Sequence, residues 1–434
     1  MPKTQPNTAV GRNVFMYWEG PDRFPLIRTL RFLIRTFSKR GRGYVLHLIN
    51  RANLAEYLDP IPSGFFDLEL AHQADIVRVC SICKFGGLWL DSDTLVQSPL
   101  DSIFDVLDSG QDGVLVTELD SLSNGAFASR PRTLLMEEWK RRIFEHVHTH
   151  NGVNQWNAIG SDLLLSIQQD MPHALEKYTI LHGPSTVYPI NWNVAVDRFL
   201  CCPAPGKELE LVTREYQPFL VLVNSVYRAI EKQVMSSWLA KEDCLLQRLL
   251  RRTFSAVQWS APLKFVEIGT SHFDTLIETA GEDSGISVEP IAYYLDALPD
   301  RPNVRKVNAA VSNRSGNVEV FFIPESVIDQ HKLPSWFKGC NCIDKPHPLH
   351  VKHNVLHLVQ QTTVQVLSAE DLWISYKIRE VEFLKIDTEG HDVVILRSLF
   401  ALLLDLPPEF RPRRIKFESN EHSSPVNVDE VIAI

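Results

Sequence analysis

The sequence predicts an α/β protein of two domains. The chain has 434 residues, which is too long for a single core of ordinary size. In both halves, short apolar segments of strand length alternate with longer segments of helical periodicity. This pattern restarts after residues 253–262, where an apolar strand runs into a glycine turn at Phe265–Gly269. We therefore expect one domain in residues 1–253 and a second in residues 254–434.

The first half begins with a strand, an amphipathic helix and a second strand, expected at Val14–Trp18, Ile27–Ser38 and Tyr44–Ile49. A mostly helical segment at Phe65–Lys84 then leads through two glycines to a short apolar strand at Leu88–Leu90. Further along we expect a strand at Gly113–Thr117, helices at Leu134–Val147 and Ser161–Gln169, a strand at Phe219–Val223 and a basic, helix-rich segment at Val226–Thr253.

The second half contains five strands that are largely apolar: Phe265–Gly269, Ile286–Pro290, Val304–Val311, Val381–Gly390 and Arg413–Ser419. Apolar strands separated by helical stretches predict a parallel sheet covered by helices on both faces. In an open sheet of this kind, ligands bind at the carboxyl ends of the strands, near the point where the strand order reverses.

The composition is typical of a globular protein, with 44% hydrophobic and 22% charged residues. A net charge of −9 argues against a sequence-independent nucleic-acid binder, which needs a basic face. No apolar run reaches the roughly 18 residues of a membrane span, and the N-terminus lacks the apolar core of a secretory signal. Seven cysteines in a long chain with ample core indicate a reducing, cytoplasmic setting. Oligomeric state leaves no signal in the sequence.

The strand Leu88–Leu90 ends in two carboxylates, Asp91 and Asp93. A buried strand that ends in two acids is costly unless a positive group lies there. Hard divalent cations such as Mn²⁺ or Mg²⁺ prefer carboxylate oxygens and often share their other positions with a diphosphate. Asp75 and Arg78, three residues apart on the preceding helix, lie on one face of it. Together these residues predict a sugar-nucleotide site.

Residues 13–240 resemble the DXD sugar-transferases of glycosyltransferase family 32, which are relatives of capsular-polysaccharide transferases. The matching residues are Trp18 with Gly20, Ala74–Arg78, Gly86–Asp93 and, more weakly, Val187–Trp192. The resemblance implies a Rossmann-like GT-A fold, a UDP- or GDP-sugar as donor, a glycan as acceptor and retention of anomeric configuration.

The same resemblance implies a role for each motif. Asp91 and Asp93 would hold Mn²⁺ or Mg²⁺, which stabilises the departing diphosphate. Asp75 and Arg78 would bind sugar hydroxyls and phosphate, and an arginine fork suits both. Trp18 would stack on the nucleotide base.

Simpler interpretations stay open for these residues. The two aspartates fit a solvated turn, Asp75 and Arg78 fit a surface ion pair, and Trp18 fits a core position. Asp162 lies near the acceptor or is an acid at a helix N-terminus. Family members often carry a metal-binding His in the late strand, which this chain lacks. Either Asn224 or water completes the coordination, or metal affinity is reduced.

Four blocks of the second half, within residues 265–420, resemble FkbM-type methyltransferases. They are Phe265–Leu276, Ile286–Pro290, Val307–Gly316 and Phe383–Leu396, of which the last contains the specific KIDTEGHD motif. The resemblance implies a Rossmann-like class I methyltransferase fold, S-adenosylmethionine as cofactor and O-methylation of hydroxyls, often those of sugars.

The cofactor-binding residues follow from the strand ends. Glu267 and Gly269 end the first strand, and the glycine permits close approach of the backbone to the cofactor. Glu289 ends the second strand, where an acid accepts hydrogen bonds from ribose hydroxyls. Asn308, after the third strand, is expected beside the adenine. Simpler roles for the last two are a solvated strand end and a turn residue.

The catalytic candidates are Asp387, Glu389 and His391, which follow the fourth strand, next to where methyl group and acceptor must meet. Either Glu389 or His391 could take the acceptor proton. We favour Asp387 and Glu389 as positioning groups and leave the base unassigned, because methyl transfer needs little beyond alignment. A structural cap is the simpler role for Asp387.

Two departures from the family pattern affect this second domain. Ser271 replaces the usual second glycine of the first loop. The chain also ends soon after the fifth strand, so either the sequence is a fragment or the sheet has an open edge.

The sequence thus predicts a bifunctional enzyme of glycan biosynthesis, which transfers a sugar and O-methylates a sugar hydroxyl. One rival hypothesis keeps the sugar transfer and makes the second domain a non-catalytic module. Another is a glycan-binding scaffold with two inactive sites.

Overall fold

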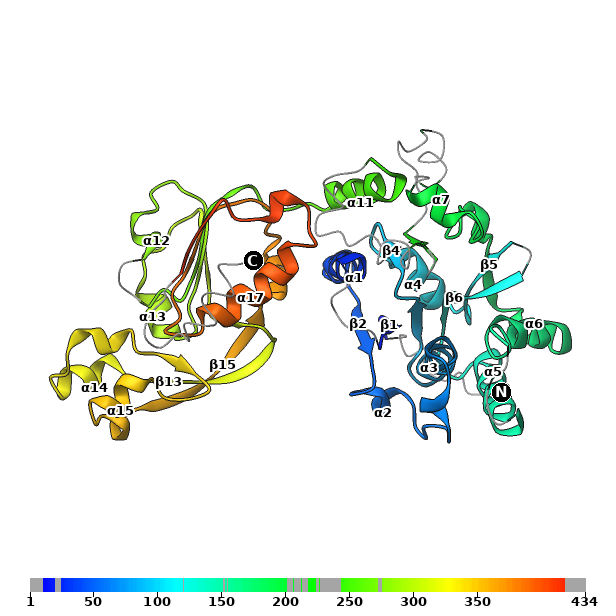
Figure 1. The fold of residues 1–434 in the computed structure, drawn as a ribbon, viewed down its shortest axis with the longest axis horizontal. Helices are drawn as coiled ribbons and strands as arrows, with labels where there is room; N and C mark the ends of the chain where they lie inside the picture. Colours follow the sequence, from blue (N-terminus) through cyan, green and yellow to red (C-terminus); the bar gives the residue numbers. More distant parts are fainter. Residues whose placement is uncertain are drawn as a thin grey trace, which may run out of the picture. The chain divides into compact units, whose positions relative to one another are not determined.

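The structure is a computed structural model that describes residues 11–19, 25–119, 121–150, 153, 155–200, 206, 212, 218–223, 226, 243–271 and 275–417. The chain divides into two compact units, Met1–Val257 and Gln258–Ile434 (Figure 1), here called the N-terminal unit and the C-terminal unit. Each unit contains a sheet flanked by helices, which confirms the predicted α/β class with Rossmann-like sheets.

The N-terminal unit is built on a six-stranded sheet in the order β2-β1-β3-β6-β5-β7. The strands are β1 (Asn13–Tyr17), β2 (Val45–Ile49), β3 (Gly87–Leu90), β5 (Gly113–Glu118), β6 (Ser121–Ser129) and β7 (Tyr178–Leu181). β1 pairs in parallel with both β2 and β3, whereas β6 runs antiparallel to β3 and β5. The carboxyl ends of β1 and β3 therefore meet at one edge of the sheet.

A two-stranded antiparallel sheet of β4 (Thr94–Val96) and β8 (Phe219–Val221) follows this edge. The helices of the unit are α1 (Pro25–Ser38), α2 (Leu54–Tyr57), α3 (Leu70–Phe85), α4 (Asp101–Asp108), α5 (Leu134–His150), α6 (Ser161–Asp170), α7 (Ala195–Leu200) and α11 (Leu245–Ala256). Residue 224 and residues 227–242 of the expected late segment lie outside the described residues.

Helix α3 is the element that determines the site of this unit. From His72 to Cys83 every residue except Ala74 is buried, because α3 packs against β1 on one side and α5 on the other. A helix that is buried all round has no face on which charges stay hydrated. Asp75 and Arg78 are therefore placed inside the protein, where each needs a partner.

The C-terminal unit contains a fully parallel five-stranded sheet in the order β11-β10-β9-β16-β17. The strands are β9 (Leu263–Ile268), β10 (Gly285–Val288), β11 (Val304–Val307), β16 (Val381–Ile386) and β17 (Arg414–Phe417). The order reverses between β9 and β16, so the loops that follow these two strands lie side by side at the switch point.

A second sheet, β12-β15-β13-β14, was not predicted. Its strands are β12 (Ala310–Ser312), β13 (Gly316–Phe322), β14 (Cys342–Ile343) and β15 (Gln360–Ser368). The prediction of a single strand at Val304–Val311 is wrong: this segment forms two strands, β11 and β12, which belong to different sheets. The break falls at Asn308, whose side-chain amide donates to the carbonyls of Glu289 and Pro290, both at 2.9 Å.

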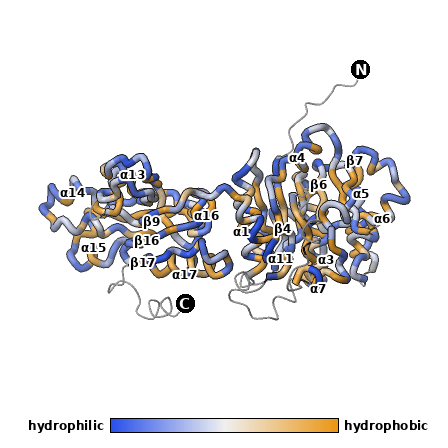
Figure 2. Tube along the Cα trace, turned by 90° about the horizontal axis from the view of Figure 1, so that it is seen from above, coloured by the Kyte–Doolittle hydropathy of each residue, from blue (hydrophilic) through white to orange (hydrophobic). Residues whose placement is uncertain are grey.

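The helices of the C-terminal unit are α12 (Leu276–Thr279), α13 (Ala292–Ala297), α14 (Glu325–Gln330), α15 (Pro348–Lys352), α16 (Ala369–Tyr376) and α17 (Asp392–Leu403). Apolar residues follow α17 along its length (Figure 2), and its side chains Ile395, Leu396 and Leu399 are fully buried. None of the described helices in either unit is long and apolar enough to cross a membrane.

Gly269 fixes the close approach of the two loops at the switch point. The backbone N–H of Asp387 donates to the carbonyl of Ile268 at 2.9 Å. Gly269 has a φ of 79°, and a Cβ there would lie far inside van der Waals distance of the Asp387 carbonyl oxygen. Only glycine satisfies both conditions without displacing the loop.

We therefore expect Gly269→Ala to reduce the free energy of unfolding by about 2 kcal/mol or more, since a clash adds to backbone strain. Gly281→Ala is the matched control, because Gly281 also has a positive φ of 56° but open space around its Cα. Strain alone should cost the control about 1 kcal/mol. Urea unfolding measures both variants, and equal losses would contradict the steric argument.

Candidate active sites

In the N-terminal unit, the two predicted acids lie at the edge where β1 and β3 end. Asp91 and Asp93 follow β3 directly, and the hydroxyl of Ser92 between them donates to the carbonyl of Tyr17 at 2.8 Å. Trp18 is the next residue after Tyr17, so the structure places it beside the acidic turn. Trp18 is half-buried, with the Arg31 guanidinium 5.4 Å from its ring.

The buried Arg78 joins the acids of helix and turn. Its Nη2 atom lies 3.3 Å from Asp75 Oδ1 and 3.2 Å from Asp91 Oδ1. Its Nη1 atom donates to the carbonyl of Asn124 at 2.5 Å, and its guanidinium lies 5.3 Å from the Trp89 ring. Indole Nε1 of Trp89 in turn donates to Asp91 Oδ1 at 2.8 Å. The structure thus brings three of the four predicted charged residues into direct contact.

Asn124 on β6 belongs to this cluster, although the sequence did not indicate it. Its amide donates to Asp75 Oδ1 at 2.8 Å, and its Oδ1 accepts from the hydroxyl of Ser161 at 3.3 Å. A Cβ on Gly160 would clash with the Asn124 amide. The backbone at the start of α6 can therefore pack against Asn124 only because residue 160 has no side chain. Asp162, by contrast, is exposed on the first turn of α6.

Burial raises the pKa of all three carboxyls. The pKa of Asp75 rises to about 6, because desolvation outweighs the attraction of Arg78. Desolvation also raises the pKa of Asp91, although the Arg78 charge opposes this rise. It raises the pKa of Asp93 as well, and the negative charge of Asp91 raises the Asp93 pKa further. Among these side chains, three carboxylates face a single guanidinium.

This donor set fits a hard divalent cation. Two carboxylates one residue apart supply oxygen ligands, and a cation would relieve the charge that raises their pKa values. In the part of the chain that the structure describes, no three His, Cys, Asp or Glu side chains gather at a metal site. A cation here would therefore draw further ligands from its substrate or water. Asn224, the expected additional ligand, lies outside the described residues.

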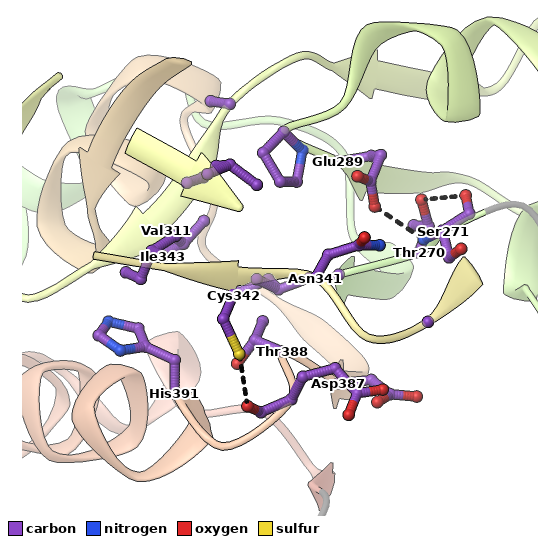
Figure 3. A pocket seen from close by; sticks show the side chains of 18 residues that line it. Thr270, Ser271, Glu289, Val311, Asn341, Cys342, Ile343, Asp387, Thr388 and His391 are labelled. Carbon is purple, nitrogen blue, oxygen red and sulfur yellow. Dashed lines mark hydrogen bonds between the residues drawn. The ribbon is translucent and has the colours of Figure 1, made fainter. Parts of the chain in front are cut away.

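In the C-terminal unit, a pocket opens at the switch point (Figure 3). Glu289 enters it from above in this view, and Asp387 and His391 enter from below. Gly269, Ser271 and Glu389 also line it, so six residues around the predicted cofactor and acceptor positions share one cavity.

Glu289 is held by the backbone of the loop after β9. Its carboxylate accepts from the backbone N–H of Ser271 at 2.7 Å and of Ile291 at 2.9 Å. Burial, which outweighs these hydrogen bonds, raises its pKa to about 7. Ser271 has the glycine-like φ of 48°, and its buried Oγ has no hydrogen-bond partner within the described structure. A buried acid and a buried, unpartnered hydroxyl beside Gly269 fit a polar cofactor such as S-adenosylmethionine.

Two predicted cofactor residues do not line the pocket. Glu267 is fully buried, where its carboxylate accepts from Lys385 Nζ at 3.0 Å and from the N–H of Leu276 at the start of α12. Asn308 is exposed, and its amide donates to the two carbonyls that directly follow β10. The structure thus shows a structural contact for each, and neither is among the residues that line the pocket.

The three catalytic candidates meet at the pocket with different partners. Asp387 Oδ2 lies 4.0 Å from Lys385 Nζ, and burial raises its pKa although this cation lowers it. His391 Nε2 is 2.9 Å from the hydroxyl of Ser312 on β12, and burial lowers its pKa. Glu389 faces the buried His347.

Fold and sites thus define an α/β protein with one acidic site and one cofactor-type pocket. Residues 2–148 match the family model of capsular polysaccharide synthesis proteins, and residues 267–433 match the methyltransferase FkbM domain. The chain therefore carries a capsular polysaccharide synthesis domain followed by an FkbM methyltransferase domain, as the motifs predicted. The two domains support a function in glycan biosynthesis.

Similar solved structures are glycosyltransferases. One is the apo-form GlyE of Streptococcus pneumoniae TIGR4, with a TM-score of 0.33 and 16% identity over 69% of this chain and 81% of that chain. Another is a glycosyltransferase involved in the glycosylation of the major capsid of PBCV-1, with a TM-score of 0.32 and 15% identity over 52% of this chain and 100% of that chain. A third is the PaToxG glycosyltransferase, with a TM-score of 0.26 and 12% identity over 52% and 87%. A search of curated proteins finds no match.

The pKa of Asp75 predicts a pH dependence of stability. Its folded pKa of about 6 exceeds the ordinary 3.8, so the unfolded chain ionises first as the pH rises. The stabilisation that the Asp75 carboxyl contributes is fully present below pH 3.8 and is lost as the pH rises through about 6. Between about pH 5 and about pH 7 we expect the wild type to lose about 1 kcal/mol more than Asp75→Asn.

Differential scanning calorimetry of the intact chain at both pH values measures this difference. Asp101→Asn is the control, because hydrogen bonds and charges of Arg12 and Arg42 outweigh desolvation and lower the Asp101 pKa. The control should keep the wild-type decline between the two pH values. A decline that persists unchanged in Asp75→Asn would contradict the prediction.

Proposed function

We propose that the N-terminal unit transfers a sugar from a UDP- or GDP-sugar to a glycan acceptor, and that the C-terminal unit O-methylates a sugar hydroxyl with S-adenosylmethionine. The observation that carries the first half is the buried contact of Arg78 with Asp75 and Asp91 at the end of β3. A plain surface ion pair is exposed to solvent, whereas the side chains of Arg78 and Asp75 are only 6% and 7% exposed.

Each side chain of the N-terminal cluster has a proposed role. Asp91 and Asp93 bind Mn²⁺ or Mg²⁺, which when bound stabilises negative charge on the diphosphate leaving group. With a cation at Asp91, Arg78 would need only its contacts with Asp75 and Asn124, and the rest of its fork would bind donor phosphate or hydroxyls. Asp75, held by Asn124, accepts from sugar hydroxyls, and Trp18 stacks on the base. Retention of configuration is proposed from the family resemblance.

In the C-terminal unit, Glu289 and the Gly269 loop are proposed to hold S-adenosylmethionine, which when bound supplies an electrophilic methyl group. Glu289 accepts hydrogen bonds from its ribose. Asp387, Glu389 and His391, on the other side of the same pocket, orient the acceptor hydroxyl and take its proton. A methyl group on a newly added sugar removes a hydroxyl available for elongation, which gives the fusion of the two domains a chemical rationale.

The sugar-transfer proposal is tested by donor hydrolysis. We expect a panel of UDP- and GDP-sugars to be hydrolysed with Mn²⁺, and Asp91→Ala to reduce the rate at least about 100-fold, because charge on the leaving group is then uncompensated. Asp170→Ala is the control, since this exposed acid at the end of α6 pairs with Arg142 of α5 and with no described residue of the cluster. A wild-type rate in Asp91→Ala, or in wild type with chelator, would exclude the metal role.

Binding of S-adenosylmethionine, measured by calorimetry, tests the second half. Because the Glu289 pKa is about 7, its carboxyl is mostly protonated at about pH 6 and accepts fewer hydrogen bonds. We expect affinity to rise between about pH 6 and about pH 8, and Glu289→Gln to bind about tenfold more weakly without this rise.

Glu382→Gln is the matched control for this experiment, because Glu382 on β16 pairs with the exposed Lys264 and Arg414 and does not line the pocket. The control should bind as the wild type does at both pH values. Absence of binding to the wild type would instead favour the rival hypothesis of a non-catalytic C-terminal module.

A further inference from the structure

Glu389 is held in a strained conformation at the pocket wall. It is a non-glycine residue with a φ of 54°, between β16 and α17, and its side chain is 25% exposed. Cys342 on β14 donates its thiol to the Glu389 carbonyl at 3.5 Å. Such backbone strain persists only where surrounding contacts determine the conformation. The direction of the Glu389 side chain is therefore set by its surroundings.

The most informative of these surroundings is His347, which nothing else assigns to the site. Its ring is fully buried, and its Nε2 lies 3.4 Å from Glu389 Oε2. Its Nδ1 accepts from the backbone N–H of Leu349 at 3.2 Å, within the first turn of α15. Since an accepting Nδ1 carries no proton, the neutral ring has its proton on Nε2, which faces the carboxylate.

A neutral donor is chemically suited to this position. A lysine or arginine would hold the carboxylate ionised and make it a weak proton acceptor. A neutral imidazole N–H orients the carboxylate while leaving it free to take a proton. The separation of 3.4 Å is long for a hydrogen bond, as such contacts often are before substrates bind.

The two other candidates at the pocket have less suitable partners. Asp387 lies 4.0 Å from the Lys385 cation, whose charge opposes the larger rise in the Asp387 pKa that burial causes. His391 engages its Nε2 with Ser312. Glu389 differs from both. Its contact with His347 places no cation beside it, and its own carboxylate oxygens are the atoms that would take the proton.

We propose that His347 is a positioning residue that aims Glu389 as the base of the methyl transfer, an inference that rests on the proposed function. The acceptor hydroxyl gives its proton to the Glu389 carboxylate as its oxygen bonds to the methyl carbon. The electron pair of the breaking carbon–sulfur bond returns to sulfur, which becomes a neutral thioether. The products are a methyl ether and a protonated Glu389.

The test compares the binding of two cofactor analogues by calorimetry. S-adenosylhomocysteine lacks the transferable methyl group and reports on the cofactor pocket alone. Sinefungin carries an amine where the methyl group would be, so a carboxylate aimed at that point binds it more tightly. We expect the wild type to prefer sinefungin by about tenfold or more, as for a charge-assisted hydrogen bond.

Variants of His347 then separate positioning from folding. His347→Leu and Glu389→Gln should reduce the sinefungin preference to near one without changing the affinity for S-adenosylhomocysteine. His347→Gln should keep the preference, because its amide can place a donor where Nε2 lies. His350→Leu is the matched control: His350 is equally buried in the same segment, its ring nitrogens form no hydrogen bond in the described structure, and this variant should keep the preference too.

The possible results are distinct. A wild type that binds neither analogue refutes the proposed methyl transfer itself. A wild type that binds both equally, or a preference that survives in His347→Leu, overturns the assignment of His347 alone. If His347→Leu fails to fold, His347→Asn replaces it, since asparagine is too short to reach Glu389. Equal preferences in His347→Asn and His347→Gln would then overturn the proposal.

Discussion

Both sites depend on one constraint, which is the desolvation of carboxylates at the carboxyl ends of buried parallel strands. Asp91 follows β3 and Glu289 follows β10, and burial raises the pKa of each. An acid in such a position is stable only if nearby donors replace the water that it has lost. The surrounding structure is therefore arranged to supply those donors.

The two units supply them in different ways. In the N-terminal unit, the donor is the side chain of Arg78, shared between helix and turn acids. In the C-terminal unit, the donors to Glu289 are backbone N–H groups, which need no particular side chain at Ser271 or Ile291. A backbone donor tolerates substitution, which explains how serine stands where glycine is usual while the left-handed φ is kept.

The sequence was most informative where the relevant contacts are local. The spacing of Asp75 and Arg78 on a helix and the acids that end β3 were predicted, because both follow from neighbours in the chain. Asn124 was missed, since it lies on β6, and SLSNGAFAS has few of the β-branched and aromatic residues that indicate a strand. Its contact with Asp75 depends on the pairing of β6 with β3, which periodicity does not reveal.

The register of the sheet explains why Glu267 does not line the pocket. The sequence indicated an acid near the end of the first strand, but β9 and β16 pair so that Lys385 lies directly across from it. Opposite charges on directly opposed residues make a buried pair, and this pair occupies Glu267. The same limit applies to His347: its partner Glu389 was predicted, but the contact between these two distant residues does not follow from local spacing.

The charges of the proposed cosubstrates account for the difference between the sites. A nucleotide diphosphate leaves as an anion, so the N-terminal site needs added positive charge, and its excess of carboxylates over Arg78 suits a divalent cation. S-adenosylmethionine is itself a cation and leaves as a neutral thioether, so no further cation is required. Beside its methyl group a carboxylate oriented by a neutral histidine is sufficient, whereas a second cation would oppose cofactor binding.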